Sequence, residues 1–502
     1  MTGALPVVVG VGQVTRRDDD DVALAEPLTL VLDAARAAEE DAGARLLDRI
    51  DSIELMPIGA WSYDDLAGLV VERLGLDAAR VRAREHPVGG ETPIRALDAA
   101  AARIAAGNAR VVLLAGAEGT RAVTRARRLG IDLPWTPPGS RSTIPKRDPA
   151  LQRAAAVGIG RAIHCFPLYE HALRAHEGVS LADAQAESGV LWSGLTTIAA
   201  ANPYAWSHTV RDAHAVADVH ADNRMVSFPY PKSLTANPFV NQGAALLMTD
   251  ADTARALGIP EDRWVHPIGG AGADEPTDPR ARSAYHHVPA LDVTVRDVQE
   301  VTGTTADEYD LVELYSCFPA MPKLTRRALG RDPSASLSVT GGLSFFGGPG
   351  SNYLTHSLAA MVERLRSDGG TGFVHGVGMF NTKHHALVLR DRPRDDGAYP
   401  SPRHDVGASR PPVTDPVPVV EDYAGRATVV TCTVTFDRDG APESGAVICA
   451  GAHGERLAAA VHEPDTLAAL TDGTEPVGTE GTVTQGDLPV FTVRGLRFPN
   501  AI

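Results

Sequence analysis

The sequence predicts an α/β protein made of two similar halves and followed by a small all-β domain. Short apolar strands alternate with helical patterns as far as about residue 392, and this alternation is typical of α/β folds. One succession of glycine turn, helix, glycine and strand occurs twice. After residue 415, apolar and polar residues alternate strongly, which indicates β-strands.

The composition is that of a globular protein and does not indicate binding to nucleic acid or to anionic membranes. The chain has 502 residues, of which 44% are hydrophobic and 22% charged, enough for roughly two to four domains. Its net charge of −16 is not offset by any run of Lys or Arg. Nucleic acid and anionic membranes would be repelled by such a surface, so we expect neither as a partner.

The cellular location is inferred from two further features. The N-terminal apolar run is short, interrupted by glycine and without a basic flank, so it predicts a strand rather than a membrane helix or signal peptide. The cysteines lack CxxC spacing and indicate neither a disulfide framework nor a zinc site. They are Cys165, Cys317, Cys432 and Cys449. We therefore expect a cytoplasmic protein.

In the first half, the stretch 86–104, "HPVGGETPIRALDAAAARI", is the most informative. It predicts a glycine turn and then a helix over 93–106, with Thr92 as N-cap and Pro93 in the first helical position. A strand in "LPVVVGVGQ" and a helix in "PLTLVLDAARAAEEDAG" precede it, and a buried strand over 109–117 follows it. The glycine turn would place backbone N–H groups where an anion or a thiolate could bind.

The second half repeats this order. Residues 341–378 predict a glycine turn, a helix over 352–367, Gly369–Gly370 and a strand. Two more strands correspond, since 242–250 resembles 384–391 and "VVVGVGQ" resembles 265–272. We expect the two apolar, glycine-flanked helices to be buried side by side between the halves.

The chain therefore divides into four parts. Residues 1–250 form the first half and contain a loop domain at about 119–240, because that segment is too long for a simple connection. Residues 251–392 form the second half, and the Pro-rich segment 393–414 is a linker. Residues 415–502 predict a β-barrel-like domain with the hairpin turn "DRDG". Its 5 basic and 13 acidic residues give −8, a charge unsuited to nucleic acid.

Several motifs together carry a family resemblance. "DLVELYSCFP", "NQGAALLM" and "GGLSFFGGPGSN", with the duplicated halves and the loop domain, resemble the thiolase superfamily, most closely the sterol carrier protein type. "GVGQVTRR", "VGGETP", "NRMVSFPYPK" and "NTKHHALVL", with the additional C-terminal domain, resemble the actinobacterial thiolase-like proteins of type 1. The resemblance implies the thiolase fold, two duplicated halves in a five-layered α/β/α/β/α arrangement.

The resemblance also shows that the usual catalytic groups are missing. A thiolase needs a thiolate at the tip of the first-half helix, and a histidine and a second cysteine in the second half. Here Gly90 occupies the place of the nucleophile, Gly348 that of the histidine and His375 that of the second cysteine. Glycine cannot be acylated, so we expect no covalent acetyl-enzyme.

Other side chains could carry the remaining chemistry. Tyr315 could act as a general acid or base, with its pKa lowered by a nearby cation, or it could be a buried structural tyrosine. Cys317 is a weaker candidate, because the cysteine of this tetrad is not the acylated one in the sterol carrier type. The candidate catalytic residues are Tyr315, His375, His384 and Cys317, and the candidate substrate-binding residues are Gly90, Glu91, Ser316, Gly347, Gly348 and Lys383.

No resident cofactor or metal is expected, and a CoA thioester would be the substrate or ligand. "GVGQVT" is an incomplete dinucleotide fingerprint. The histidines and aspartates between residues 208 and 222 match no standard metal spacing.

The resemblance implies an acyl-CoA-binding acetyl-CoA acetyltransferase in lipid or acyl-CoA metabolism that lacks the usual nucleophilic cysteine. The alternatives are a retro-aldolase acting on a β-hydroxyacyl-CoA and a non-catalytic thioester-binding scaffold. The resemblance implies a homodimer or a monomer.

Overall fold

The computed structural model describes residues 4–18, 21–140, 148–400 and 410–493. Two sheets pack against a shared pair of central helices. The strand order of the first sheet is β1 (Pro6–Thr15), β7 (Gln242–Asp250), β4 (Val111–Glu118), β2 (Ser52–Leu55) and β3 (Arg82–Glu85). That of the second is β8 (His266–Asp274), β11 (Lys383–Arg390), β10 (Thr371–Gly378) and β9 (Leu311–Leu314).

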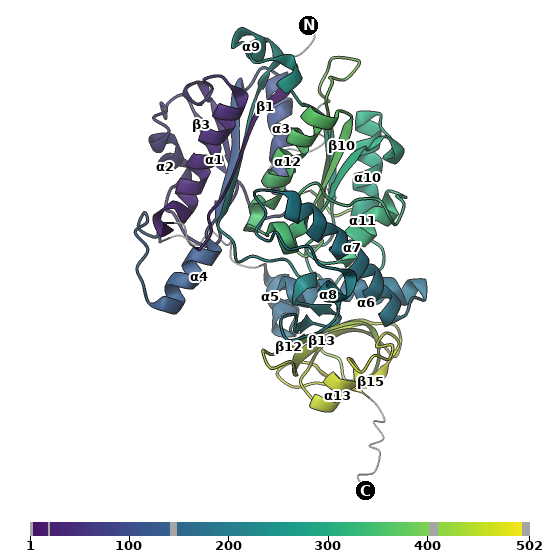
Figure 1. The fold of residues 1–502 in the computed structure, drawn as a ribbon. Helices are drawn as coiled ribbons and strands as arrows, with labels where there is room; N and C mark the ends of the chain where they lie inside the picture. The colour runs from purple at the N-terminus through teal and green to yellow at the C-terminus, as the bar shows by residue number, and fades with distance from the viewer. Residues whose placement is uncertain (1–3, 19–20, 141–147, 401–409, 494–502) are drawn as a thin grey trace.

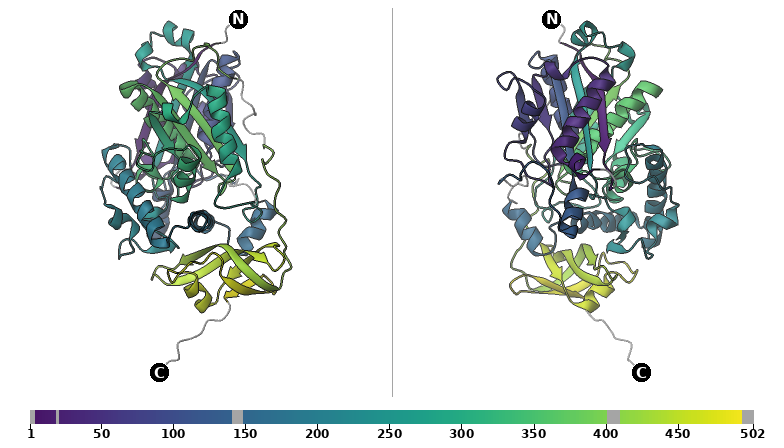
Figure 2. Two further views of the ribbon diagram at one scale, coloured as in Figure 1. Left: turned by 90° about the vertical axis from the view of Figure 1, so that its right-hand side faces the viewer. Right: turned by 60° about the vertical axis from the view of Figure 1, so that its left-hand side comes forward.

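The layers follow the order that the sequence predicts. Helices α3 (Thr92–Ala105) and α12 (Tyr353–Asp368) lie side by side between the two sheets. Helix α1 (Pro27–Ala42) covers the outer face of the first sheet, and α10 (Pro289–Thr302) that of the second (Figures 1 and 2). The result is a five-layered α/β/α/β/α arrangement.

The central helices are buried because small and aliphatic residues cover them on most sides. Leu97 and Ala100 of α3, and Leu354 and Leu358 of α12, are fully buried. The two sheets also join along one edge, where Val8 and Val265 exchange backbone hydrogen bonds of 2.8 and 3.1 Å. The two halves therefore share one apolar core.

Three further helices complete the halves: α2 (Leu66–Arg73), α9 (Ala251–Ala256) and α11 (Ala320–Ala328). The edge strand β3 exposes the charged side chains of Arg82, Arg84 and Glu85. Charges on an edge strand oppose pairing with the edge of another sheet. No helix among the described residues is both long and apolar enough to cross a membrane.

The loop domain lies between β4 and β7 and covers one end of the two halves (Figure 1). Its elements are α4 (Thr120–Leu129), α5 (Pro149–Ala156), α6 (Ala162–Glu177), α7 (Leu181–Ala201), α8 (Ala213–Ala217), β5 (Met225–Ser227) and β6 (Tyr230–Pro231). A buried ion pair fixes it to the second half, because Lys323 of α11 donates to Glu170 (2.7 Å) and Ser188 (2.8 Å).

The C-terminal domain is a closed, barrel-like sheet with one short helix. Strand β12 pairs with both β13 and β15, and so closes the order β13, β14, β16, β15 and β12. The elements are β12 (Gly425–Phe436), β13 (Pro442–Gly451), β14 (Arg456–Val461), α13 (Pro464–Ala469), β15 (Glu480–Thr484) and β16 (Val490–Val493). The predicted turn over 437–440 joins β12 to β13.

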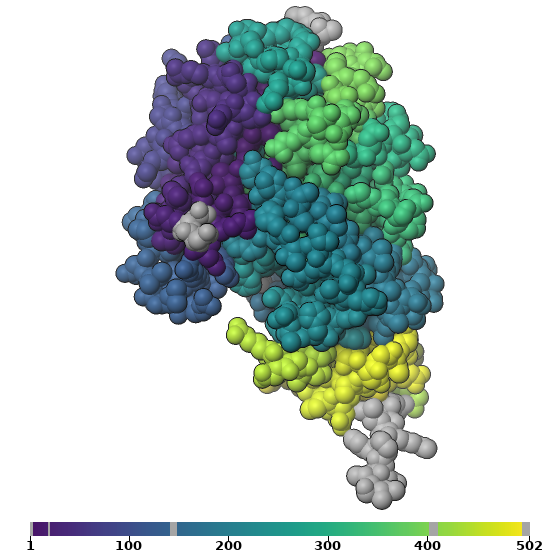
Figure 3. Space-filling view, in the orientation of Figure 1, coloured from purple at the N-terminus to yellow at the C-terminus, as the bar shows by residue number. Residues whose placement is uncertain are grey.

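This domain is docked on the loop domain at the far end of the molecule (Figure 3). The backbone N–H of Phe228 donates to Val434 (2.9 Å), and Thr431 Oγ1 donates to the Leu168 carbonyl (2.6 Å). Arg174 of α6, with a side chain only 3% exposed, forms a bidentate ion pair with Glu475. The loop domain thus lies between the two halves and the C-terminal domain.

The Arg174–Glu475 pair should stabilise this docking. Glu475→Gln removes the charged acceptor of a buried guanidinium, and we expect a loss of about 1–3 kcal/mol in the free energy of unfolding. Glu480→Gln makes the same change at an exposed position of β15 and serves as the control. Calorimetry on both variants measures the difference, and equal stabilities would rule out this role for the pair.

Candidate functional site

The candidate site lies at the N-terminal tips of α3 and α12. The N-cap of α3 is Glu91 and not the predicted Thr92, so the helix begins one residue earlier than expected. The backbone N–H of Gly89 donates to Ser351 Oγ (3.2 Å), in the turn that opens α12. The two glycine turns of the repeat therefore meet, and the positive dipole ends of α3 and α12 lie together there, where they can attract negative charge.

Tyr315 fills the place where a nucleophilic side chain would project from Gly90. A Cβ atom on Gly90 would collide with Tyr315 Oη and the Val377 carbonyl oxygen, and would lie 2.6 Å from Tyr315 Cζ. Gly90 itself is half-buried. The structure thus brings the predicted Tyr315 and Gly90 together.

The pKa of Tyr315 shifts in the direction opposite to the one expected. Burial, helped by Cys317 and Glu91, raises the pKa of the Tyr315 phenol well above its ordinary value. The residue is 8% exposed, so desolvation of a phenolate dominates its pKa, instead of the stabilisation by a cation that we expected. Tyr315 is therefore a protonated hydrogen-bond donor.

A buried glutamate holds the surroundings of Tyr315 in place. The ring of Tyr315 packs edge-on against Tyr353, with 5.9 Å between centroids. Tyr353 donates to Glu313 Oε1 (2.6 Å), and the N–H of Val339 donates to Glu313 Oε2 (2.8 Å). Sequence reasoning missed Glu313 and Tyr353, although a lone glutamate in the apolar strand "DLVEL" was a usable signal.

Ser316 and Cys317 are buried next to Tyr315 without an activating partner for the thiol. Ser316 Oγ accepts a long hydrogen bond from the Leu343 N–H (3.4 Å). Burial raises the pKa of the Cys317 thiol far above its usual range. A thiol is a poor nucleophile compared with a thiolate, so Cys317 is a poor replacement for the missing cysteine.

His375 and His384 lie on the other face of the second sheet. Gly376 faces α3, because a Cβ atom there would lie 2.7 Å from Glu91 Cα. Side chains alternate along a strand, so His375 points away from α3, towards Thr325 Oγ1 of α11 (3.2 Å). His384 Nδ1 lies 3.2 Å from His375 Nε2 on that same face. The structure does not bring these histidines to Gly90.

Burial also makes these histidines poor acid–base groups. It lowers the pKa of His375 to about 3 and that of His384 well below the ordinary value. Both imidazoles are therefore neutral at physiological pH, and both are fully buried. These properties are typical of structural histidines.

The glycine-rich turn of the second half approaches the loop domain closely. The N–H of Gly348 donates to the Asn237 carbonyl (2.8 Å). Gly347 has φ +119°, and a Cβ there would lie 2.6 Å from Gln242 Oε1. Gly347 and Gly348, to which the resemblance assigns substrate binding, can therefore offer only backbone atoms, and they lie four and three residues before Ser351.

Lys383 follows a hairpin with unusual backbone geometry. Met379, Phe380 and Asn381 all have positive φ, from 45° to 68°, which costs energy in non-glycine residues. Two hydrogen bonds hold the hairpin: Tyr169 donates to the Phe380 carbonyl (3.0 Å) and Arg282 to that of Asn381 (2.9 Å). The hairpin places the half-buried Lys383 near Glu91, whose carboxyl it influences electrostatically.

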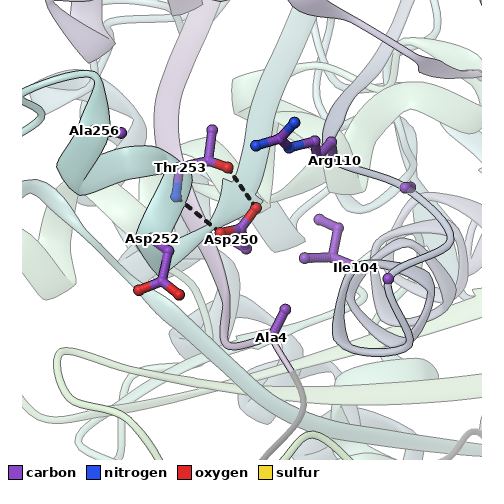
Figure 4. A pocket seen from close by; sticks show the side chains of 9 residues that line it. Ala4, Ile104, Arg110, Asp250, Asp252, Thr253 and Ala256 are labelled. Carbon is purple, nitrogen blue, oxygen red and sulfur yellow. Dashed lines mark hydrogen bonds between the residues drawn. The ribbon is translucent and has the colours of Figure 1, made fainter.

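A surface hollow of about 440 Å³ is separate from this site. It is lined by Ile104, Arg110, Asp250 and Thr253, with Thr253 bonded to Asp250 (2.6 Å), as Figure 4 shows. Ile104 is near the C-terminal end of α3, roughly 18 Å along the helix from its first turn. Among the described residues, no group of three His, Cys, Asp or Glu side chains is arranged to hold a metal ion.

Comparison with known proteins agrees with this architecture. Residues 412–487 match the additional C-terminal domain of thiolase-like protein type 1. The monomeric SCP2-thiolase-like protein type 1 from Mycobacterium smegmatis is 28% identical, with a TM-score of 0.79 over 97% of this chain and 99% of that one. No curated protein matches the chain.

Two less similar structures share the fold. The Ltp2-ChsH2(DUF35) aldolase is 16% identical, with a TM-score of 0.59 over 78% of this chain and 99% of that one. Human mitochondrial 3-ketoacyl-CoA thiolase in complex with CoA is 17% identical, with a TM-score of 0.55 over 77% of this chain and 98% of that one. The chain therefore has the thiolase fold, and its last domain is similar to the additional C-terminal domain of thiolase-like protein type 1.

Proposed function

We propose that the chain binds a CoA thioester at the tips of α3 and α12 and cleaves or forms a carbon–carbon bond by proton transfer. The observation that carries this proposal is the position of the Tyr315 hydroxyl, which takes the place of a side chain at Gly90. A protonated phenol there can donate to a reacting carbon or oxygen, but it cannot form a stable thioester intermediate. The ligand class is supported by the thiolase fold, one example of which is described with CoA.

Retro-aldol cleavage fits this set of groups best. In a β-hydroxyacyl-CoA, loss of the hydroxyl proton breaks the bond between Cα and Cβ, and a ketone or aldehyde leaves. The remaining thioester enolate takes a proton at Cα, which Tyr315 can supply. The positive dipole ends of α3 and α12 can stabilise the enolate oxygen. One structure with this fold is described as an aldolase, and this supports the class of reaction.

Acyl transfer through the enzyme has no support from the geometry. Position 90 has no side chain, and Cys317 is a buried thiol with a raised pKa. The same facts favour a second candidate, a thioester-binding protein without catalysis.

We further propose that the chain works as a monomer, given the charged edge strand β3 and the monomeric M. smegmatis structure.

Intact-protein mass spectrometry tests the absence of an acyl-enzyme. After incubation with acetyl-CoA and acetoacetyl-CoA we expect the unmodified mass, because a nucleophilic thiolate is missing. A stoichiometric acetyl adduct on Cys317 would contradict the proposal and would restore acyl transfer as the function.

Tyr315→Phe tests the chemical role of the hydroxyl. On a panel of β-hydroxyacyl-CoA substrates we expect turnover to fall by about 10²–10⁴-fold, with acyl-CoA affinity nearly unchanged. Tyr309→Phe removes one hydroxyl from another buried tyrosine of the same half and should keep the wild-type rate.

The outcomes separate the candidates. Full activity in Tyr315→Phe would remove its role as proton donor. Binding of CoA thioesters without any turnover by the wild-type protein would favour the non-catalytic candidate. If the wild-type protein neither binds nor cleaves them, the ligand class itself is wrong.

A further inference from the structure

The carboxyl group of Glu91 is buried at the site without a complete set of partners. Glu91 follows Gly90 directly and is 2% exposed. Its Oε2 atom has no hydrogen-bond partner among the residues that the structure describes. Most buried carboxyl oxygens are hydrogen-bonded, because desolvation without a partner is costly. An unpartnered one beside a candidate site therefore calls for a functional explanation.

The surrounding backbone leaves room for this carboxyl group. A Cβ atom on Gly89 or Gly378 would collide with Glu91 Oε2, and one on Gly376 would lie 2.7 Å from Glu91 Cα. Strand β10 thus has glycine at both positions, 376 and 378, that face the start of α3. Glycines on two separate segments, Gly89 before α3 and Gly376 and Gly378 on β10, therefore leave the space that Glu91 occupies.

Charged groups from several elements act on Glu91. Burial raises the pKa of its carboxyl group. Lys383 of β11, a hydrogen bond from the Glu91 backbone N–H and Arg95 of α3 lower it, and Asp274 of β8 raises it again. Asp274 is itself paired with Arg410 (2.7 Å). Glu91 in turn contributes to the raised pKa of Tyr315, so the two groups are within electrostatic range of each other.

We propose that Glu91 is the proton-accepting catalytic residue of this site and acts opposite Tyr315 on a β-hydroxyacyl-CoA. The inference rests on the proposed function and adds the missing base. The ionised Glu91 carboxylate takes the proton of the β-hydroxyl group as the Cα–Cβ bond breaks and its electron pair moves into the thioester enolate. Tyr315 then protonates Cα. Glu91 is left protonated and Tyr315 ionised, and a net transfer of that proton from Glu91 to Tyr315 restores both groups.

The other titratable groups nearby fit this role less well. His375 and His384 face away from α3, and His385, which does face α3, is bonded to Asp98 (3.1 Å). Lys383 is a cation whose charge favours the ionised form of Glu91. Lys383 is therefore a positioning residue for the charge of Glu91.

The first test removes the base. Glu91→Gln keeps the shape of the side chain and should lower turnover of the β-hydroxyacyl-CoA panel by about 10²–10⁴-fold, with nearly unchanged affinity for acyl-CoA in calorimetric titration. Glu91→Asp keeps the acid and should recover part of the rate. Glu118→Gln is the matched control, because Glu118 is another buried carboxyl group, whose oxygens accept from the N–H groups of Gly59 (2.5 Å) and Ala60 (3.0 Å). It should keep the wild-type pH profile.

The second test uses the pH dependence, which a purely structural role would not change. Activity should rise with pH as Glu91 ionises, giving an acidic limb in kcat/KM. Lys383 lowers the pKa of Glu91, so Lys383→Met should raise that pKa and move the limb to higher pH. If the acidic limb of kcat/KM lies at the same pH in Lys383→Met as in the wild type, the assignment of Glu91 is contradicted. This result is decisive even if Glu91→Gln fails to fold.

The results distinguish this inference from the proposed function. If Tyr315→Phe is inactive while Glu91→Gln keeps the wild-type rate, the proposed function stands and Glu91 is not the base. If the wild-type protein binds the panel but cleaves none of it, both the proposed function and the role of Glu91 are overturned.

Discussion

The site depends on one steric constraint, the mutual exclusion of the Tyr315 ring and any side chain at position 90. The Tyr315 hydroxyl and the Val377 carbonyl oxygen occupy the space that a Cβ atom of residue 90 would need. Tyr315 cannot easily retreat, because Tyr353 packs against its ring and is in turn bonded to Glu313. The helix tip therefore keeps its N–H groups and its glycine turn but presents a phenol instead of a thiolate.

Burial then decides the charge state of almost every candidate group. Tyr315 and Cys317 stay protonated, and His375 and His384 stay neutral, because a charged form would lose its hydration. Burial raises the pKa of Glu91 as well, but Lys383 and Arg95 oppose part of that increase. A site of this kind favours proton transfer between a phenol and a carboxylate over covalent catalysis, and this distinction links the packing to the proposed chemistry.

Much of the fold could be predicted from the sequence, since the repeated order of turn, helix and strand indicated the duplicated halves and the buried pair of helices. The family resemblance gave Gly90 as the vacant position and Tyr315 as its neighbour. It failed for His375 and His384, because side chains alternate along a strand and the glycines of β10 take the face towards α3. The N-cap was wrong by one residue, which is common at helix ends. Contacts between distant segments, such as Glu313 with Tyr353 and Arg174 with Glu475, leave no local pattern in the sequence.

The most direct test of these roles is a crystal structure of the full chain with a β-hydroxyacyl-CoA analogue whose thioester sulfur is replaced by NH, because an amide enolate is a much poorer leaving group and the analogue resists retro-aldol cleavage. We expect the analogue to bind at the tips of α3 and α12, with its Cα close enough to Tyr315 Oη for proton transfer and its hydroxyl group beside Glu91. The Tyr315 ring should remain over Gly90. An analogue bound elsewhere, or a Tyr315 ring displaced from Gly90 by the ligand, would contradict the proposed roles of Tyr315 and Glu91.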